Sequence, residues 1–270
     1  MTLIIKQLFI YPIKGIAGIA VNSAQAEEIG FQHDRRMMFV DDQNNFISQR
    51  SHPELSQIQC TILDGHYMIT YSGKQIKIPF ENGQALYDER LKFAVKVFDD
   101  ELMAYELSPE ISLRFSELLG APVKLVTLGK ESLRMKTLIK EPLETKVSFA
   151  DGYPYLVLGT ASLLKLEEMM ELSVNKMRFR PNMIIETTFP FEEDVLDLVN
   201  IGSAQFRMIK PCARCQVVNI DPETGLSEKQ TLATLSAFRK VENKVYFGVN
   251  TICLKEGEVK VGDSLDLVNC

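Results

Sequence analysis

The sequence predicts a mainly β protein with a few helices, an α+β class, in which short strands build barrel-like or sandwich sheets. Three observations support this prediction. Short runs rich in β-branched and aromatic residues recur along the chain and end at Gly, Pro, Asn or Asp, as strands do. Helical spacing of apolar residues is confined to a few segments. The 270 residues are enough for two domains of ordinary size.

The first hundred residues are predicted to be strands and hairpins. An apolar run over residues 3–13 ends near Pro12 and Gly15. The hairpins that follow are predicted at 36–41 with 46–50, at 66–71 with 75–79, and at 93–98 turning at Asp99-Asp100. Near the other end of the chain, 245–253 and 259–268 are predicted to form a hairpin that turns at Glu256-Gly257.

Three segments carry helix signals. Ser108-Pro109 is followed by an apolar stripe and Gly120, which supplies an N-cap, a proline at the first helical position and a terminal glycine. The other two helices are predicted at 160–172 and, shorter, at 232–238. The charged stretch 129–146 is predicted to connect two domains, which we place at 1–125 and 126–270.

Composition excludes several classes of protein. A net charge of −6 argues against non-specific attraction to nucleic acid or to an anionic membrane. We expect no signal peptide, and no apolar run approaches the roughly 20 residues that span a bilayer. The five cysteines are odd in number and mostly scattered, which fits a reducing cytoplasm better than a disulfide framework.

The most informative motif is Lys210-Pro-Cys-Ala-Arg-Cys215, in which two thiols lie beside two cations. Neighbouring positive charge favours the thiolate, the form of cysteine that attacks electrophiles and binds soft metals. A zinc site would need about four ligands, and there is no second CxxC pair. A thioredoxin-like redox pair is expected at a strand-to-helix junction, whereas this pair is predicted between β-like runs at 204–209 and 216–220. Two inert, buried cysteines remain the alternative.

Cations recur at the ends of predicted strands and in loops, where binding sites are usually built. Arginine binds phosphate and other oxyanions through two parallel hydrogen bonds. The set comprises Lys14, Arg35, Arg36, Arg50, Arg178, Arg180, Lys210 and Arg214. Asp151-Gly-Tyr-Pro either orients a ligand or is simply a turn before a strand. Composition does not show whether these residues converge.

Taken together, these motifs resemble a known family. The segment Tyr11-Pro-Ile-Lys-Gly, then 30–41 and Ser48-Gln-Arg50, is similar to the N-terminal β-barrel module that precedes a MOSC domain. A second set resembles the MOSC domain itself: Phe179-Arg-Pro-Asn182, Phe191-Glu-Glu-Asp194, the CxxC motif, Asp221-Pro-Glu-Thr-Gly225 and Phe247-Gly-Val-Asn. The motifs keep their order from about residue 3 to residue 268, and the branch they resemble includes the mitochondrial amidoxime reducing component and its bacterial counterparts.

The resemblance implies a molybdenum cofactor, molybdopterin carrying molybdenum, and an oxidoreductase that reduces N-hydroxylated compounds by oxygen-atom removal at the metal. Cys215 matches the position that ligates molybdenum, and Cys215 and Asp151 match catalytic positions. The cofactor-binding residues implied are Lys14, Arg35, Arg50, Asp151, Arg180, Asn182, Arg214 and Cys215. One soft thiolate within a ring of cations suits a metal that carries an anionic pterin phosphate.

Some positions depart from the family pattern. Gly15 and Ala213 stand where small hydroxyl residues are common, and Met37 stands where an aromatic is frequent. The cysteines match no spacing for a four-thiolate iron–sulfur cluster, so electrons are expected from a separate protein of ferredoxin, flavoprotein or cytochrome type. An alternative is a non-catalytic protein that binds the cofactor or carries sulfur as a persulfide on Cys215, because MOSC domains also occur in cofactor sulfurases.

Overall fold

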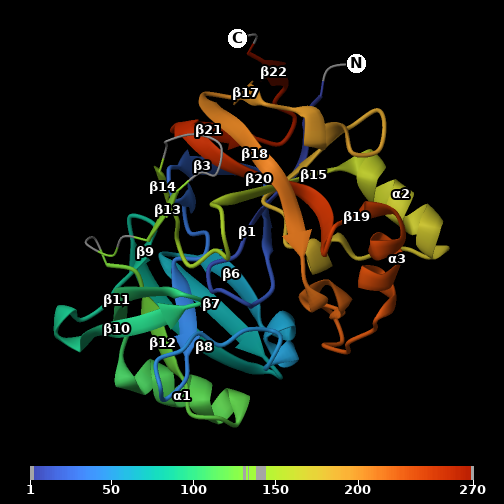
Figure 1. The fold of residues 1–270 in the computed structure, drawn as a ribbon. Coiled ribbons are helices and arrows are strands. Elements are labelled where there is room, and N and C mark those ends of the chain that lie inside the picture. Colours follow the sequence, from blue (N-terminus) through green and yellow to red (C-terminus); the bar gives the residue numbers. More distant parts are fainter. Residues whose placement is uncertain (1–2, 130–131, 133, 138–143, 269–270) are drawn as a thin grey trace.

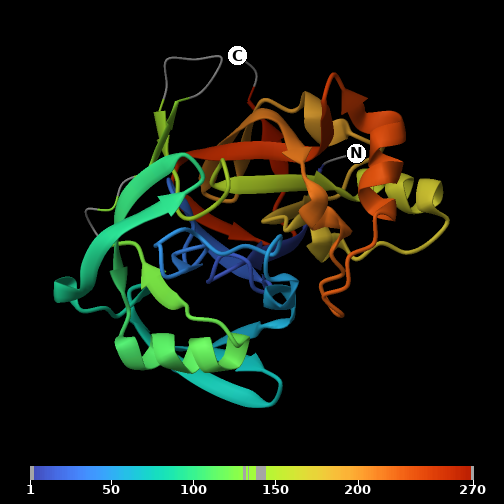
Figure 2. The same ribbon diagram turned by 60° about the horizontal axis from the view of Figure 1, so that its bottom comes forward.

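The computed structural model describes residues 3–129, 132, 134–137 and 144–268. Strands dominate and helices are few, which confirms the predicted class. Figures 1 and 2 show two β-rich parts side by side, with α1 (Pro109–Leu119) under one and α2 (Thr160–Met170) and α3 (Gln230–Arg239) against the other. Among the described residues, no helix is long and apolar enough to cross a membrane.

The largest sheet follows the order β2-β1-β16-β15-β20-β18-β17-β22, with β19 paired to β20. Its strands are β1 (Ile5–Ile10), β2 (Ile19–Val21), β15 (Tyr155–Gly159), β16 (Met183–Ile185), β17 (Leu198–Ile201), β18 (Ala204–Arg214), β19 (Lys240–Val241), β20 (Lys244–Lys255) and β22 (Leu265–Leu267). All residues of β15 and β16 are buried, as expected for strands covered on both faces.

Smaller sheets complete the fold. One has the order β10-β11-β12-β5 and another β6-β7-β8-β9, while β21 pairs with β3-β4 and β13 with β14. Their bounds are β3 (Ser23–Glu27), β4 (Gly30–Phe31), β5 (Met37–Val40), β6 (Gln59–Leu63), β7 (His66–Tyr71), β8 (Lys74–Glu81), β9 (Gln84–Ala85), β10 (Lys92–Val97), β11 (Asp100–Glu106), β12 (Lys124–Thr127), β13 (Met135–Thr137), β14 (Glu144–Lys146) and β21 (Gly257–Lys260).

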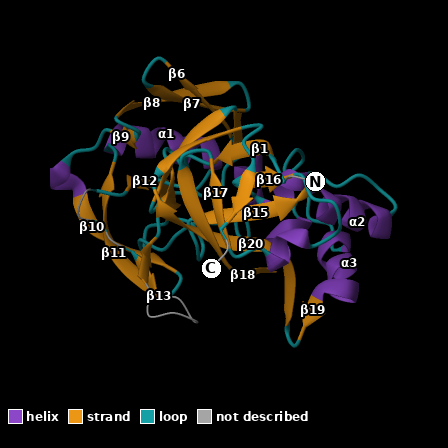
Figure 3. Ribbon diagram, turned by 90° about the horizontal axis from the view of Figure 1, so that it is seen from above, coloured by secondary structure: helices purple, strands orange, loops and turns teal. Residues whose placement is uncertain are grey.

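The helix α1 begins and ends where local chemistry predicts. The Ser108 hydroxyl accepts a hydrogen bond from Ile111 N at 3.1 Å, and Gly120 ends α1 in the left-handed region with φ 67°. Figure 3 shows α2 and α3 side by side. Leu166 of α2, Leu235 of α3 and Phe247 of β20 belong to one apolar cluster. Short 3₁₀ helices are η1 (Pro53–Gln57), η2 (Glu89–Leu91), η3 (Lys176–Phe179), η4 (Glu192–Val195) and η5 (Gln216–Asn219).

One predicted hairpin is confirmed only next to its turn, and another is wrong. Val40 and Phe46 form an isolated antiparallel bridge and Ile47 N donates to Phe39 O at 2.9 Å, but 48–50 is a loop, and the strand that pairs with all of β5 is β12. After β20, β21 pairs with β3 and buries Val259 there, while β22 pairs with β17. The hairpins at β7–β8 and β10–β11 are confirmed.

Strands from the two ends of the chain share sheets, since β1 pairs with β16 and β3 pairs with β21. The division into 1–125 and 126–270 therefore stays a prediction. The predicted connection at 129–146 lies partly outside the described residues, and its described part includes the β13–β14 hairpin.

Candidate functional site

A cavity of about 520 Å³ lies between the two β-rich parts. Loops from both parts line it, including 14–15, 48–50 and 150–153. The structure brings all eight predicted site residues to its wall: Lys14, Arg35, Arg50, Asp151, Arg180, Asn182, Arg214 and Cys215. Their roles stay predictions, but their convergence is a property of the fold.

The strands β18 and β20 form the longest pairing in the large sheet, and the C-terminal end of β18 places the two thiols at the cavity. Cys212 lies within β18, and Cys215 follows its end as the N-cap of η5, with its side chain exposed. The β-like run predicted at 216–220 is therefore wrong. Val218 and Ile220 are buried two residues apart, which mimics a strand in sequence, while Asn219 Oδ1 accepts from Leu232 N at 2.9 Å and ties the turn to α3.

This correction removes one argument used against a thioredoxin-like pair, because Cys215 does stand at a strand-to-helix junction. However, Cys212 is three residues earlier, inside the strand, and η5 spans only four residues.

Two arginines reach the sulfur atoms. Arg50 Nη2 lies 3.9 Å from Cys215 Sγ, and Arg214 Nη1 donates to Cys212 Sγ at 3.1 Å. The four residues Arg50, Cys212, Arg214 and Cys215 are called the thiol end below. They are exposed or half-buried, so this wall of the cavity is open to solvent.

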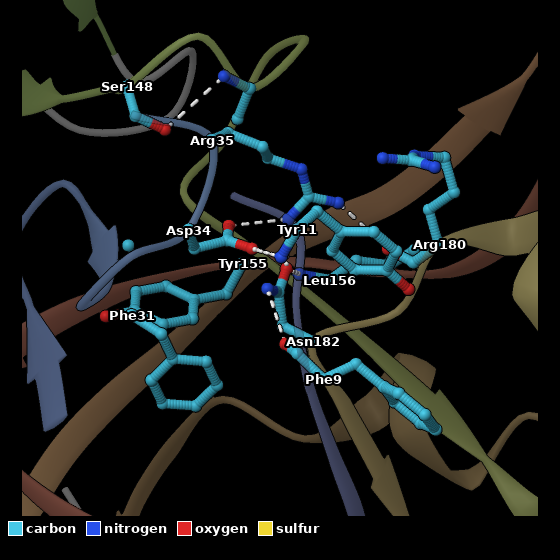
Figure 4. A network of polar contacts seen from close by, with 12 residues as sticks. Phe9, Tyr11, Phe31, Asp34, Arg35, Ser148, Tyr155, Leu156, Arg180 and Asn182 are labelled. Atoms are coloured by element: carbon cyan, nitrogen blue, oxygen red, sulfur yellow. Dashed lines mark hydrogen bonds and ion pairs between the residues drawn. The ribbon is translucent and has the colours of Figure 1, made fainter. Parts of the chain in front are cut away.

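Another part of the wall is formed by Arg35, Arg180 and Asn182, and behind it lie the fully buried Tyr11 and Asp34. These five residues are called the buried arginine network below (Figure 4). Arg35 Nη1 donates to Asp34 Oδ2 at 2.6 Å and to Asn182 Oδ1 at 3.0 Å, and Arg35 Nη2 donates to Arg180 O at 3.1 Å. Asp34 also accepts from Tyr11 N at 2.8 Å. The guanidinium of Arg35 is thereby fixed at the cavity wall.

Tyr11 is the centre of this network, because the Arg35 and Arg180 guanidinium carbons each lie 4.3 Å from its ring centroid. Burial raises the pKa of Tyr11, so its hydroxyl stays neutral and donates to Pro181 O at 3.0 Å. Burial and repulsion from Arg35 lower the pKa of Arg180 to about 10. Two like charges held this close would be relieved by an anion in the cavity.

The two arginines of the buried arginine network, Arg35 and Arg180, also have an uncommon backbone conformation. Arg35 has φ 52° and Arg180 has φ 54°, the left-handed region that costs a non-glycine residue about 1 kcal/mol or more. Such outliers cluster at functional sites, where the surrounding structure forces them.

Asn182 is only 1% exposed, and both of its side-chain polar atoms are occupied. Its Oδ1 accepts from Arg35 and from Leu156 N at 3.2 Å, and its Nδ2 donates to Phe9 O at 3.2 Å. Asn182 lines the cavity, but its polar atoms hold Arg35 and two backbone groups, so its geometry is that of a positioning residue.

Lys14 and Asp151 form an ion pair at the cavity wall, and Lys14 Nζ also donates to Phe149 O at 2.8 Å. Burial lowers the pKa of Lys14, against the influence of Asp151. Asp151 presents a side chain that is 74% exposed; desolvation raises its pKa, but the charges of Lys14 and Arg35 outweigh this and lower it to about 2. Asp151 is consequently ionised at neutral pH.

The donor set fits an anionic ligand that carries a soft metal. It offers one exposed thiol, cations from both parts of the chain, and a volume within the range of small-ligand pockets, about 300–1,000 Å³. Among the described residues, Arg180 Nη2 and Arg214 Nε are buried without a hydrogen-bond partner, and buried donors usually have one. An oxyanion in the cavity is a suitable acceptor for such donors.

Sequence reasoning missed several residues of this site. Tyr11 and Asp34 were visible only as parts of the quoted motifs, and their burial gives them their role. Gln49 donates to Gly15 O at 2.6 Å, which shapes the loop beside Lys14. Gly15 itself has φ 94°, so a hydroxyl residue at this position would be strained in this fold.

Comparison with known proteins agrees with these features. The family model of the MOSC N-terminal beta barrel domain matches residues 2–122, and that of the MOSC domain matches residues 144–266.

The chain belongs to the MOSC-domain proteins.

The chain is also similar to two named proteins over most of its length. It is 29% identical, over 94% of its length, to molybdenum cofactor sulfurase of Oryza sativa subsp. japonica, and spans 33% of that protein. It is 28% identical, over 96% of its length, to mitochondrial amidoxime reducing component 2 of Bos taurus, and spans 81% of that protein. A solved structure, the YuaD protein from Bacillus subtilis, aligns over 98% of this chain and 94% of its own, with 9% identity and a TM-score of 0.47.

Proposed function

We propose that this MOSC-domain chain binds a molybdenum cofactor through Cys215 and reduces N-hydroxylated compounds such as amidoximes and hydroxylamines. The observation that carries the proposal is one exposed thiol in a cavity whose walls gather cations from both parts of the chain. Resemblance to the amidoxime reducing component supports the reaction, and that relative is matched over most of its own length.

Both parts of the wall hold the cofactor in this proposal. Cys215 at the thiol end supplies the metal ligand, while Arg214 beside it and Arg35 and Arg180 of the buried arginine network hold the phosphate and pterin. When bound, the cofactor supplies the two-electron chemistry that removes the oxygen of an N-hydroxyl group. A separate electron-donor protein returns the electrons, and a reducing cytoplasm suits an unpaired Cys215.

The ion pair between Lys14 and Asp151 faces the space left for substrate. Asp151 is ionised at neutral pH because its pKa is about 2, so it accepts hydrogen bonds and orients an N–H or O–H group. It is not a proton donor under these conditions. Lys14, whose pKa burial lowers, is the better proton donor of the two.

Metal content tests the proposal directly. The protein is purified from a cofactor-competent host, and molybdenum is measured by mass spectrometry in wild type, Cys215→Ala and Cys212→Ala. We expect near-stoichiometric metal in wild type and in Cys212→Ala, and loss of most of it in Cys215→Ala. Equal metal in the two variants, or none in wild type, contradicts the assignment.

A persulfide carrier is the second candidate. It is supported by the similarity to a molybdenum cofactor sulfurase, which is 29% identical over 94% of this chain, with the chain spanning 33% of that protein. Intact-protein mass spectrometry decides between the two. The carrier is supported if Cys215 carries one additional sulfur atom and the protein holds no molybdenum. It must also fail to reduce benzamidoxime when a chemical electron donor is supplied.

A further inference from the structure

Arg178 lines the cavity, but its guanidinium group holds the protein rather than the space for a ligand. Its side chain is 9% exposed. Its Nη1 donates to Asn219 O at 3.0 Å and its Nη2 donates to Asp221 Oδ2 at 2.6 Å. Both terminal nitrogens are therefore occupied, whereas Arg180 Nη2, two residues later, is buried without an acceptor among the described residues. The two neighbouring arginines have different tasks.

Asp221 is fixed in place before it meets this arginine. It begins the turn 221–225, a motif to which the proposed function assigns no task. Its Oδ1 accepts from Glu223 N at 2.9 Å and from Thr224 N at 3.1 Å. Burial acts to raise the pKa of Asp221, but these two backbone hydrogen bonds and the charge of Arg178 outweigh it and lower the pKa. The carboxylate is thus ionised, with its second oxygen on Arg178.

The Arg178–Asp221 pair connects two short helices that each lead to a site residue. Arg178 belongs to η3, and Arg180 follows as the C-cap of that helix. Asn219 ends η5, whose N-cap is Cys215. The hydrogen bond from Arg178 to Asn219 O joins η3 to η5 across 41 residues of sequence. The distance between the Cys215 thiol and the Arg180 guanidinium therefore depends on this bond.

The other contacts of η5 do not replace this hydrogen bond. Glu228 N donates to Asn219 O and Leu232 N donates to Asn219 Oδ1, both at 2.9 Å, and both come from the segment that follows η5 in the chain. Toward η3, Val218 and Phe179 share an apolar cluster, which is a non-directional contact. The hydrogen bond from the guanidinium group supplies the direction. Its loss should leave η5 folded but let the thiol shift.

We propose that Arg178, held by Asp221, is a positioning residue that fixes the Cys215 thiol at a set distance from the Arg180 guanidinium. The inference rests on the proposed role of Cys215 as a metal ligand and adds the residues that orient this ligand. A cofactor held by its metal at one end and by its phosphate at the other requires both attachments at matching positions. Removing a group that orients a metal ligand typically lowers metal affinity about 10- to 100-fold.

Two variants separate position from charge. Asp221→Asn keeps an oxygen for the turn amides but removes the charge opposite Arg178. Arg178→Lys keeps the cation, but a single ammonium group does not reproduce the fork that reaches both Asn219 O and Asp221. Glu27→Gln is the matched control, because Glu27 pairs with Arg36 at 2.8 Å and is 32% exposed, compared with 26% for Asp221. Neither residue of the control pair lines the cavity.

Alkylation of Cys215 in cofactor-free protein measures the position of the thiol. Iodoacetate is an anion and iodoacetamide is neutral, and both attack the same thiolate, so the ratio of their rates reports the cations nearby. If Asp221→Asn acted through charge alone, the ratio would rise, because a carboxylate is lost. We expect it to fall about twofold, because the thiol moves away from Arg180, and to fall likewise in Arg178→Lys. Peptide mass spectrometry assigns the alkylation to Cys215.

Molybdenum retained after dialysis is the second measurement, on protein from a cofactor-competent host. We expect about tenfold less metal in Asp221→Asn and Arg178→Lys than in wild type, and less than a twofold change in Glu27→Gln. Urea denaturation of the same preparations should show similar losses of stability in Asp221→Asn and Glu27→Gln.

The positioning role is refuted if metal loss follows stability in all three variants. It is also refuted if the alkylation ratio of Asp221→Asn rises or stays at the wild-type value. Wild type without molybdenum refutes the proposed function instead, and the alkylation ratio then still decides whether the Arg178–Asp221 pair positions Cys215.

Discussion

The two walls of the cavity are built in opposite ways. In the buried arginine network, every residue is held by contacts that cross between segments far apart in the chain, such as Arg35 to Asn182. At the thiol end, the arginines reach the sulfur atoms from an exposed loop and a strand end. A rigid wall can orient a ligand before it arrives, whereas an open wall admits it and keeps the thiol reachable.

The comparison between the two walls predicts that substitutions in the buried arginine network lower the free energy of unfolding. The largest effect is expected for Asp34→Ala, since Asp34 is fully buried and its loss leaves Arg35 charged beside an empty partner position. Breaking a buried pair in this way costs about 3–5 kcal/mol. Urea denaturation measures the loss.

Glu168→Ala is the control, because Glu168 pairs with Lys165 at 3.0 Å on the exposed face of α2. We expect no resolvable change in its stability. Equal losses in the two variants would show that burial does not set the strength of the Asp34–Arg35 pair.

Asn182→Ala is expected to have the next largest effect. It removes three hydrogen bonds and leaves the Leu156 N–H and Phe9 C=O without this partner. One or two unsatisfied buried groups cost about 2–3 kcal/mol. Asn200→Ala is the control on an exposed strand position of β17, and it should change the unfolding free energy by less than about 0.5 kcal/mol. An Asn182 variant as stable as this control would contradict the positioning role.

Acid sensitivity should follow from His33, which immediately precedes Asp34. Burial, with a further contribution from Arg36, lowers the pKa of His33 to about 4. The unfolded chain takes up this proton near pH 6.5, before the folded chain does, so stability falls as pH falls from about 6.5 to 4. Discounted for partial exposure, the loss is about 1–2 kcal/mol.

His33→Asn provides the test, because Asn tolerates the φ of 71° at this position. Denaturation at pH 7 and pH 4.5 should show a smaller loss in the variant than in wild type. The same pH dependence in both proteins would show that another group is responsible.

Comparing the predictions with the structure at α1, β21 and the cavity shows which features the sequence determines locally. The caps of α1 are local chemistry, and Ser108 and Gly120 were located correctly. The partner of β21 is not local, because Val259 packs equally well wherever a buried strand face is offered, and only the folded chain shows that β3 offers it. The eight cavity residues were named through their motifs, whereas the role of Tyr11 and Asp34 depends on their burial, which only the folded chain shows.

The smallest effect on stability, and the sharpest contrast with the network, is expected for Arg50→Gln. Arg50 is exposed and contacts Cys215 Sγ at 3.9 Å, so its loss should change the unfolding free energy by less than about 0.5 kcal/mol. A cation–anion hydrogen bond contributes about 1.5–3 kcal/mol, so the same variant should retain about tenfold less molybdenum cofactor after dialysis. Metal analysis and urea denaturation on one preparation measure both quantities. Retained metal with reduced stability would reverse the assignment, because the thiol end would then be a structural wall and the ligand would be held by the buried arginine network alone.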